Sequence, residues 1–218
     1  MPLIAIVRHA QASFGGADYD QLSDLGREQA EVVGAELARR QLRDPAVVTG
    51  RLRRQQDTAG LVAAAAGISV GSRVDGRWDE YDHFALLRRY VDPERVELAT
   101  GDSRRFQGLL DEALTAWSDD TKDAGWAAFA GDAAAALEDV AAGLPKGTDA
   151  IVVTSGGVLA ALAAGLLHAP PATAIALNRV AVNCAITTVI IGSNGANLLS
   201  FNDHAHFTGA RRSLLTYR

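Results

Sequence analysis

The stretch Leu3-Ile4-Ala5-Ile6-Val7-Arg8-His9 decides the fold class of this chain. Its apolar run predicts a buried strand, and the strand ends at a guanidinium and an imidazole. Open α/β sheets bind ligands at the carboxyl ends of their strands, so Arg8 and His9 are candidates for a site. A guanidinium offers a planar fork of donors to phosphate oxygens, and a neutral imidazole is a nucleophile that can carry a phosphoryl group. The pair indicates phosphate chemistry, although a salt-bridged arginine beside a capping histidine fits the two residues equally well.

Strand and helix patterns alternate along the rest of the chain, which predicts an α/β fold with a sheet flanked by helices. We expect helices at about Ser23–Gln41, with Ser23 as the N-cap, at Arg51–Ala66 and at Gly156–Leu167. Further strands are expected at Ala46–Val48, Ile68–Val70, Ala150–Thr154, Ala185–Ile191 and Asn197–Phe201, the last two joined by a hairpin at Gly192–Gly195.

Residues 84–143 lack strand signals and carry helical periodicity instead. The expected helices are Phe84–Tyr90, Arg104–Ser118 and Trp126–Ala142, separated by Asp, Gly and Ser. Because the segment is short and no Pro/Ser-rich linker bounds it, we interpret it as a helical insertion into a single domain that spans residues 1–218. Its apolar faces fit a core, with an interaction surface as the alternative.

The composition is that of a folded soluble domain and restricts the possible partners. With 218 residues, 48% hydrophobic and 22% charged, the chain is long enough for one sizeable core. The net charge of −5 argues against general nucleic-acid binding, which needs Lys and Arg to neutralise phosphates. A single cysteine, Cys184, excludes an internal disulfide and fits a reducing compartment. The chain opens without a secretory pattern and its apolar stretch Gly156–Leu167 is too short for a bilayer, so we expect a cytoplasmic protein with no membrane partner.

Two further segments follow expected strands and could contribute to an anion site. In Thr49–Ala59 a helix begins at the end of a strand, so its unpaired N–H groups and an arginine of its first turn could bind a phosphate. Arg51, Arg53 and Arg54 diverge around the helix, so they cannot all face one ligand, and a surface role is the alternative for each. In Ser155-Gly156-Gly157, the glycines allow either close approach of an anion or close packing of the helix on the sheet.

Together these segments resemble the motifs of the histidine phosphatase superfamily, which has the phosphoglycerate-mutase-like fold. The similar segments, in the family's order, are Val7-Arg8-His9-Ala10-Gln11, Ser23-Asp24-Leu25-Gly26-Arg27-Glu28-Gln29-Ala30, Thr49 to Ala59, Trp78-Asp79-Glu80-Tyr81-Asp82, Val152-Val153-Thr154-Ser155-Gly156-Gly157-Val158 and Asn202-Asp203-His204-Ala205-His206-Phe207. The resemblance covers nearly the whole chain and implies a three-layer α/β/α sheet with a helical insertion. The mutase form of the opening motif, Arg-His-Gly-Glu-Ser-x-Trp-Asn, is not present, so the phosphatase branch is implied.

The resemblance also implies roles for individual residues. It makes His9 the residue that becomes phosphorylated, Arg8 and Arg54 the arginines that bind phosphate with the Gly156 N–H, and Glu80 the acid/base carboxylate. The implied function is a metal-independent phosphomonoesterase that needs no cofactor and acts on a small phosphorylated metabolite. Without the family match, Glu80 would be interpreted as an exposed loop acid.

Ser155 departs from the family pattern, which has a second catalytic histidine at this position. A cationic histidine donates a charge-assisted hydrogen bond to phosphate, whereas a serine donates a neutral one that is roughly half as strong. Losing a preorganised donor of this kind costs about 10²–10³ in rate at comparable sites. The alternative function is therefore a weakened or inactive pseudoenzyme of the same fold that binds a phosphorylated ligand.

The remaining histidines are candidates for accessory roles. His83 or His204 could reach the crevice and replace the missing cation. His204 and His206, together with Asp82 and His83, superficially resemble ligands of a divalent metal, but we interpret His206 as the family's structural histidine and predict no metal. The sequence carries no signature of the substrate's identity or of the oligomeric state.

Overall fold

The structure is a computed structural model that describes residues 1–13, 20–99, 101–122 and 125–217. Part of the predicted loop after the first strand, residues 14–19, lies outside the described residues. Within the described ranges one mixed sheet has the strand order β3-β2-β4-β1-β5-β6. Its strands are β1 (Leu3–Arg8), β2 (Ala46–Thr49), β3 (Arg73–Val74), β4 (Ala150–Thr154), β5 (Ile186–Gly192) and β6 (Gly195–Asp203). β1 to β4 run parallel to one another, and β5 and β6 form an antiparallel edge.

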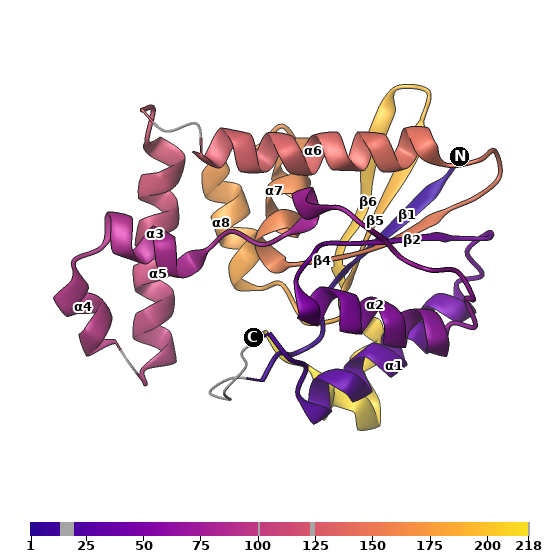
Figure 1. Cartoon of the computed structure of the whole chain (residues 1–218), viewed down its shortest axis with the longest axis horizontal. Coiled ribbons are helices and arrows are strands. Elements are labelled where there is room, and N and C mark those ends of the chain that lie inside the picture. The colour runs from indigo at the N-terminus through magenta and orange to yellow at the C-terminus, as the bar shows by residue number, and fades with distance from the viewer. Residues whose placement is uncertain (14–19, 100, 123–124, 218) are drawn as a thin grey trace.

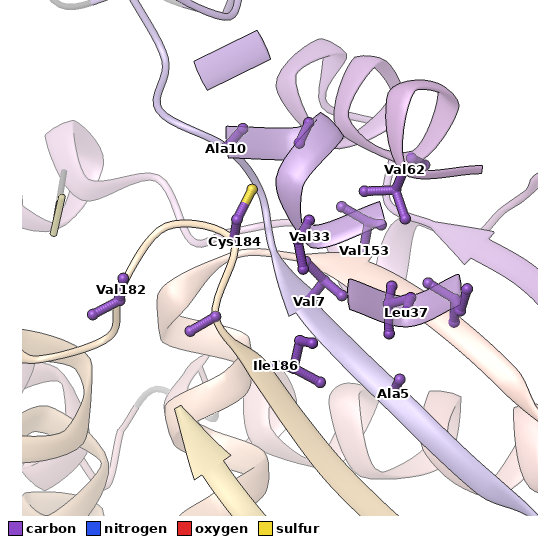
Figure 2. Close-up of a cluster of buried hydrophobic side chains, with 14 of the residues drawn as sticks. Ala5, Val7, Ala10, Val33, Leu37, Val62, Val153, Val182, Cys184 and Ile186 are labelled. Atoms are coloured by element: carbon purple, nitrogen blue, oxygen red, sulfur yellow. The ribbon is translucent and has the colours of Figure 1, made fainter. Parts of the chain in front are cut away.

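Helices cover both faces of the sheet and complete three layers (Figure 1). One face carries α1 (Asp24–Arg39) and α2 (Arg53–Ala65), and the other carries α6 (Gly125–Gly143) and α7 (Gly156–Leu166). Successive side chains of β1 alternate between the two cores. Ala5 and Val7 pack among side chains of α1 and α2, as Figure 2 shows, whereas Ile4 and Ile6 pack among those of α6 and α7. This double burial explains the uninterrupted apolar run of the strand.

The site lies where two neighbouring parallel strands, β1 and β4, send their following helices to opposite faces of the sheet. β1 leads to α1 on one face of the sheet, and the neighbouring β4 leads to α7 on the opposite face. The two strands pair in register, Arg8 opposite Thr154, and the His9 N–H donates to the Thr154 carbonyl at 2.7 Å. Such a switch point leaves a crevice at the carboxyl ends of the strands, where the sequence predicted the site.

The predicted helical insertion contains two structurally different parts. Helices α3 (His83–Tyr90), α4 (Pro93–Leu98) and α5 (Ser103–Asp119) form an arm beside the sheet layers, at the left of Figure 1. The arm has its own apolar core, which includes Leu87, Leu114 and Trp117 and reaches Ile175 of α8 (Pro171–Arg179). In contrast, α6 belongs to the third layer over the sheet. Short 3₁₀ helices lie at Gly76–Trp78, Ala205–Phe207 and Gly209–Leu214.

Most predicted elements are confirmed, with small shifts at their ends, and a few were wrong or missed. Ser23 caps α1 through a hydrogen bond from the Gly26 N–H. The strand predicted at Ile68–Val70 is wrong: Ile68 packs against the core below α2, and pairing with β2 begins only at Arg73. The helices α4 and α8 were not predicted; both are short and begin at a proline. No helix of the described ranges is both long and apolar enough to cross a membrane.

Candidate active site

His9 follows β1 and presents one nitrogen to the crevice in a defined tautomer. Its Nδ1 lies 2.8 Å from the Ala10 carbonyl oxygen. Because a carbonyl only accepts hydrogen bonds, Nδ1 carries the proton and Nε2 keeps its lone pair. Nε2 accepts a hydrogen bond from Arg54 Nε at 3.2 Å. Burial, together with the charges of Arg54 and Arg8, lowers the pKa of His9 well below its ordinary value. The imidazole is therefore neutral and nucleophilic near neutral pH.

Arg54 is the arginine of the predicted motif that faces His9. It stands in the first turn of α2, and its Nη1 forms an ion pair of 2.6 Å with Asp20. The other two arginines point elsewhere: the side chain of Arg51 pairs with Asp79 at 2.7 Å, and that of Arg53 lies 3.6 Å from Asp57. This confirms the expectation that the three arginines diverge. Asp20 also accepts from the Arg53 backbone N–H at 2.7 Å, so its carboxylate lies at the N-terminus of α2, where an anion is favoured.

Arg8 ends β1 and joins the crevice to the C-terminal segment. Its Nη1 donates to the carbonyl of Ala181 and, at 2.8 Å, to that of Tyr217. The guanidinium is close enough to His9 and Glu80 for its charge to act on both groups: it contributes to the lowered pKa of His9 and opposes the rise in the pKa of Glu80. Its Nε lies beside Gly156, 3.4 Å from the place where a Cβ would be. Arg8 therefore stands between β1 and the first turn of α7, a suitable place to bind an oxyanion.

Glu80 reaches the same crevice from the segment that follows the 3₁₀ helix Gly76–Trp78. Its Oε2 accepts a hydrogen bond of 3.0 Å from the backbone N–H of Gly157, and Oε1 accepts one of 3.3 Å from that of Tyr81. Burial raises the pKa of Glu80, which outweighs the Gly157 hydrogen bond and the nearby charges of Arg8 and Arg54. A raised pKa favours the protonated form of the carboxyl group, which is the form that a general acid requires.

Ser155 lies next to His9 but is fully buried and turned toward the protein interior. It is the N-cap residue of α7 by position, yet its side chain makes no capping hydrogen bond. Instead, Ser155 Oγ accepts a hydrogen bond of 2.9 Å from Nε2 of Gln55 on α2. The Gly156 N–H begins α7 beside it. That the Ser155 hydroxyl binds phosphate stays a prediction, and in the present conformation the hydroxyl is held by Gln55.

The three accessory histidines have different surroundings. His83 begins α3 and is near enough to Arg54 for that charge to act on it. Burial is the main cause that lowers the pKa of His83. The Arg54 charge adds to this effect, and the Asp82 charge opposes it. A lowered pKa favours the neutral form of the ring, and a role of His83 as replacement for the missing cation stays a prediction. His204 Nδ1 bonds to the carbonyl of Asn202 at 2.6 Å, and His206 Nε2 bonds to that of Cys184 at 3.0 Å. Among the described residues, no group of His, Cys, Asp and Glu side chains is arranged to hold a metal ion.

Sequence reasoning missed several residues that organise the site. They are Asp20, which pairs with Arg54; Thr58, whose hydroxyl accepts from the Ala10 N–H at 3.0 Å; Asn183, which donates to the His9 carbonyl at 3.0 Å; and Gln55. Thr58 and Gln55 lie within a recognised motif and are fully buried polar residues. Their positions on the buried face of an amphipathic helix were the available signal.

The arrangement defines a class of protein: an α/β fold whose crevice holds a neutral imidazole, two arginines and a protonatable carboxyl group at the switch point. The family model described as histidine phosphatase superfamily (branch 1) matches residues 4–204. The chain therefore belongs to the histidine phosphatase superfamily. No curated protein matches the chain.

Solved structures of this fold are similar over almost the whole chain. A mycobacterial glucosyl-3-phosphoglycerate phosphatase in complex with VO3 is 24% identical with a TM-score of 0.66, covering 93% of this chain and 100% of that one. An Entamoeba histolytica phosphoserine phosphatase mutant is 19% identical with a TM-score of 0.64, covering 95% and 100%. A Bacillus anthracis phosphoglycerate mutase is 17% identical with a TM-score of 0.62, covering 94% of each chain. At such identities the likeness establishes the phosphoglycerate-mutase-like fold.

Proposed function

We propose that the protein is a phosphomonoesterase that hydrolyses a small phosphorylated metabolite through a phosphohistidine on His9. The observation that carries the proposal is the tautomer of His9. The Ala10 carbonyl fixes the proton on Nδ1, so the lone pair of Nε2 points toward Arg54, where a phosphoryl group would be bound. A histidine kept only for structure would gain nothing from a neutral ring beside two arginines.

Each step of the proposed reaction uses groups of this chain. His9 Nε2 attacks phosphorus in line, so that an N–P bond forms as the P–O bond to the leaving group breaks. Arg8, Arg54 and the Gly156 N–H stabilise the charge on the transferring oxygens. Glu80 gives its proton to the leaving oxygen, then takes a proton from the water that attacks the phosphohistidine. Inorganic phosphate leaves, and His9 and Glu80 return to their initial protonation states.

The test is direct detection of the phosphoenzyme. Rapid mixing with 4-nitrophenyl phosphate, stopped in alkali because phosphohistidine is acid-labile, should give one equivalent of phosphate on the intact protein. The phosphate should map to His9 by mass spectrometry and be absent in His9→Ala. His168→Asn is the matched control, since His168 is exposed and its left-handed backbone (φ 53°) suits asparagine. Release of phosphate by His9→Ala at the wild-type rate would contradict the proposal.

The buried hydroxyl of Ser155 favours a second candidate function, a pseudoenzyme that binds a phosphorylated ligand without turnover. The Oγ atom is held by Gln55, so the crevice has two arginines but no second imidazole on the α7 side. This candidate predicts binding of vanadate or phosphate that depends on Arg54, with no phosphoenzyme and no release of phosphate from aryl or alkyl monoesters. Measuring binding by calorimetry beside the rapid-mixing experiment separates the two candidates.

A further inference from the structure

Gln55 is a fully buried amide whose two N–H groups have different partners. Nε2 donates to the Trp78 carbonyl at 2.9 Å and to Ser155 Oγ at 2.9 Å. Because a carbonyl cannot donate, the atom that faces Trp78 must be the NH₂ nitrogen, which fixes the orientation of the amide. On its other side, Oε1 lies against Gly50, where a Cβ would be only 2.0 Å away. The side chain therefore has a single well-defined place between α2, the Trp78 segment and the start of α7.

The two partners of Gln55 lie close in sequence to the residues that place the Glu80 carboxylate. Trp78 precedes Glu80 by two residues, and Ser155 precedes Gly157, whose N–H binds Glu80, by two residues. The Trp78 carbonyl also accepts from Thr154 Oγ1 at 2.6 Å, so this carbonyl ties the Glu80 segment to the end of β4 through Thr154 and to α2 through Gln55. One amide thus holds the backbone that carries the carboxylate and the backbone that supplies its hydrogen-bond donor.

The Ser155 hydroxyl is hydrogen-bonded to Gln55 and not to the Gly157 N–H. A serine at an N-cap ordinarily accepts from the N–H of the second or third helical residue, and Gly157 is the second residue of α7. Here Ser155 makes no such bond, and its hydroxyl oxygen accepts from Gln55. The Gly157 N–H donates to Glu80 instead.

We propose that Gln55 is a positioning residue for Glu80: by anchoring Trp78 and Ser155 it keeps the carboxyl group on the Gly157 N–H, in line with the leaving group. This inference rests on the proposed role of Glu80 as general acid. Gln55 itself touches no substrate, since its side chain is fully buried. Its removal should therefore impair proton donation while leaving the nucleophile His9 and its arginines in place.

A pair of substrates that differ in leaving group tests the proposal. Phenol is a poorer leaving group than 4-nitrophenol, so phenyl phosphate needs the general acid far more than 4-nitrophenyl phosphate does. Gln55→Leu keeps the volume and removes both donors. It should lower kcat/KM for phenyl phosphate by about 10–100-fold, and for 4-nitrophenyl phosphate by about threefold or less. In a Glu80→Gln background it should cause no further loss on phenyl phosphate. Equal losses on the two substrates would mean a merely structural role and overturn the proposal.

Gln56→Leu is the matched control. Gln56 neighbours Gln55 on the same helix but is exposed, and its side chain donates to the Arg51 carbonyl, away from Trp78 and Ser155. Should Gln55→Leu fail to fold, Ser155→Ala takes its place, because it removes one of the two anchors with little change in volume. A selective loss on phenyl phosphate supports the proposal. An equal loss on both substrates assigns Ser155 to phosphate binding and contradicts it.

A second measurement separates failure of this inference from failure of the proposed function. In ¹⁵N-labelled wild-type protein, the Gly157 amide signal should move with pH as Glu80 titrates, and it should not move in Glu80→Gln. In Gln55→Leu the movement should be lost or strongly reduced. If the wild type hydrolyses neither ester but shows this dependence on Gln55, the proposed function fails and the positioning role stands. If the Gly157 signal titrates identically with and without Gln55, the positioning role fails whatever the activity.

Discussion

The two ends of the parallel strands use buried ionisable groups in opposite ways. At the amino end, Asp149 precedes β4 and accepts hydrogen bonds from the backbone N–H groups of Leu3 and Arg43, both at 2.8 Å, and pairs with the Arg43 side chain at 2.6 Å. Burial alone would raise the pKa of Asp149, but these partners outweigh it and lower the pKa. At the carboxyl end, burial prevails, lowering the pKa of His9 and raising that of Glu80.

The difference shows what each end contributes. Asp149 is charged and satisfied, so it holds β1, β4 and the segment before β2 together, and its chemistry is inert. Burial disfavours the charged forms of His9 and Glu80, so it favours a free lone pair on one group and a proton on the other. Two groups whose surroundings disfavour charge are suited to exchange a phosphoryl group and a proton, which is the pattern of an acid–base pair in a catalytic site. Substitutions at either end of the strands test this difference.

The largest effect is expected at the carboxyl end, from Arg54→Ala. The substitution removes a donor to the transferring oxygens and should lower kcat/KM by about 10²–10³. It should also raise the pKa of His9, because the Arg54 charge is one cause of its lowered value. Steady-state kinetics with 4-nitrophenyl phosphate measure the loss. Arg53→Ala is the control on the same helix, with a side chain that is 52% exposed. A comparable loss of activity in Arg53→Ala would contradict a specific role of Arg54 in binding the phosphoryl oxygens.

At the amino end, Asp149→Ala should affect stability and spare the chemistry. It leaves two backbone N–H groups without their acceptor and removes the ion pair of the Arg43 guanidinium, which should lower the free energy of unfolding by about 2–3 kcal/mol. The activity of the folded fraction should be unchanged. Denaturant unfolding gives the first quantity. Asp139→Ala provides the contrast, because Asp139 is 60% exposed beside Arg77 and should change stability by less than about 0.5 kcal/mol. Similar losses for the two variants would remove the distinction.

The sequence predicted the charged and ionisable groups at the carboxyl end of the strands but not Asp149 at the amino end. Arg8, His9, Arg54 and Glu80 were identified because their motifs occur in the family's order, and the structure brings all four to one crevice. Asp149 was not predicted, since a single acid before a strand has no pattern and its donors are over 100 residues away in the chain.

Ser155 shows a different limit of sequence reasoning. Its position beside His9 was predicted, but the direction of its hydroxyl depends on Gln55, a residue of another helix. A motif specifies which residues come near one another, whereas a hydrogen bond between two motifs depends on their packing. The same holds for Asp20, whose pairing with Arg54 joins two segments across the crevice.

A smaller effect is expected from Ser155→His, which introduces the imidazole that the family has at this position. Because Ser155 is fully buried against Gln55, the larger ring overfills the site and should cost about 1–3 kcal/mol of stability. We expect activity to fall in Ser155→His and to recover in part when Gln55→Ala makes room. Thermal unfolding and kinetics on the single and double variants test this. A rise in activity for Ser155→His alone would show that the crevice is weakened but not rebuilt around serine.

The smallest and most discriminating effect concerns pH. The proposed mechanism requires neutral His9, whose pKa is lowered, and protonated Glu80, whose pKa is raised. As pH increases, kcat/KM should rise where His9 loses its proton, at a pH below its ordinary pKa of 6.5, and fall where Glu80 loses its proton, at a pH above its ordinary pKa of 4.5. Glu80→Gln should lose the falling limb. The free energy of unfolding should behave differently: the contribution of Asp149 is complete above pH 3.8 and is lost as pH falls through its lowered pKa. Asp149→Ala should flatten this acid limb without moving the kinetic limbs, since the two ends of the strands titrate separately. A shift of the kinetic profile in Asp149→Ala would show that they are coupled.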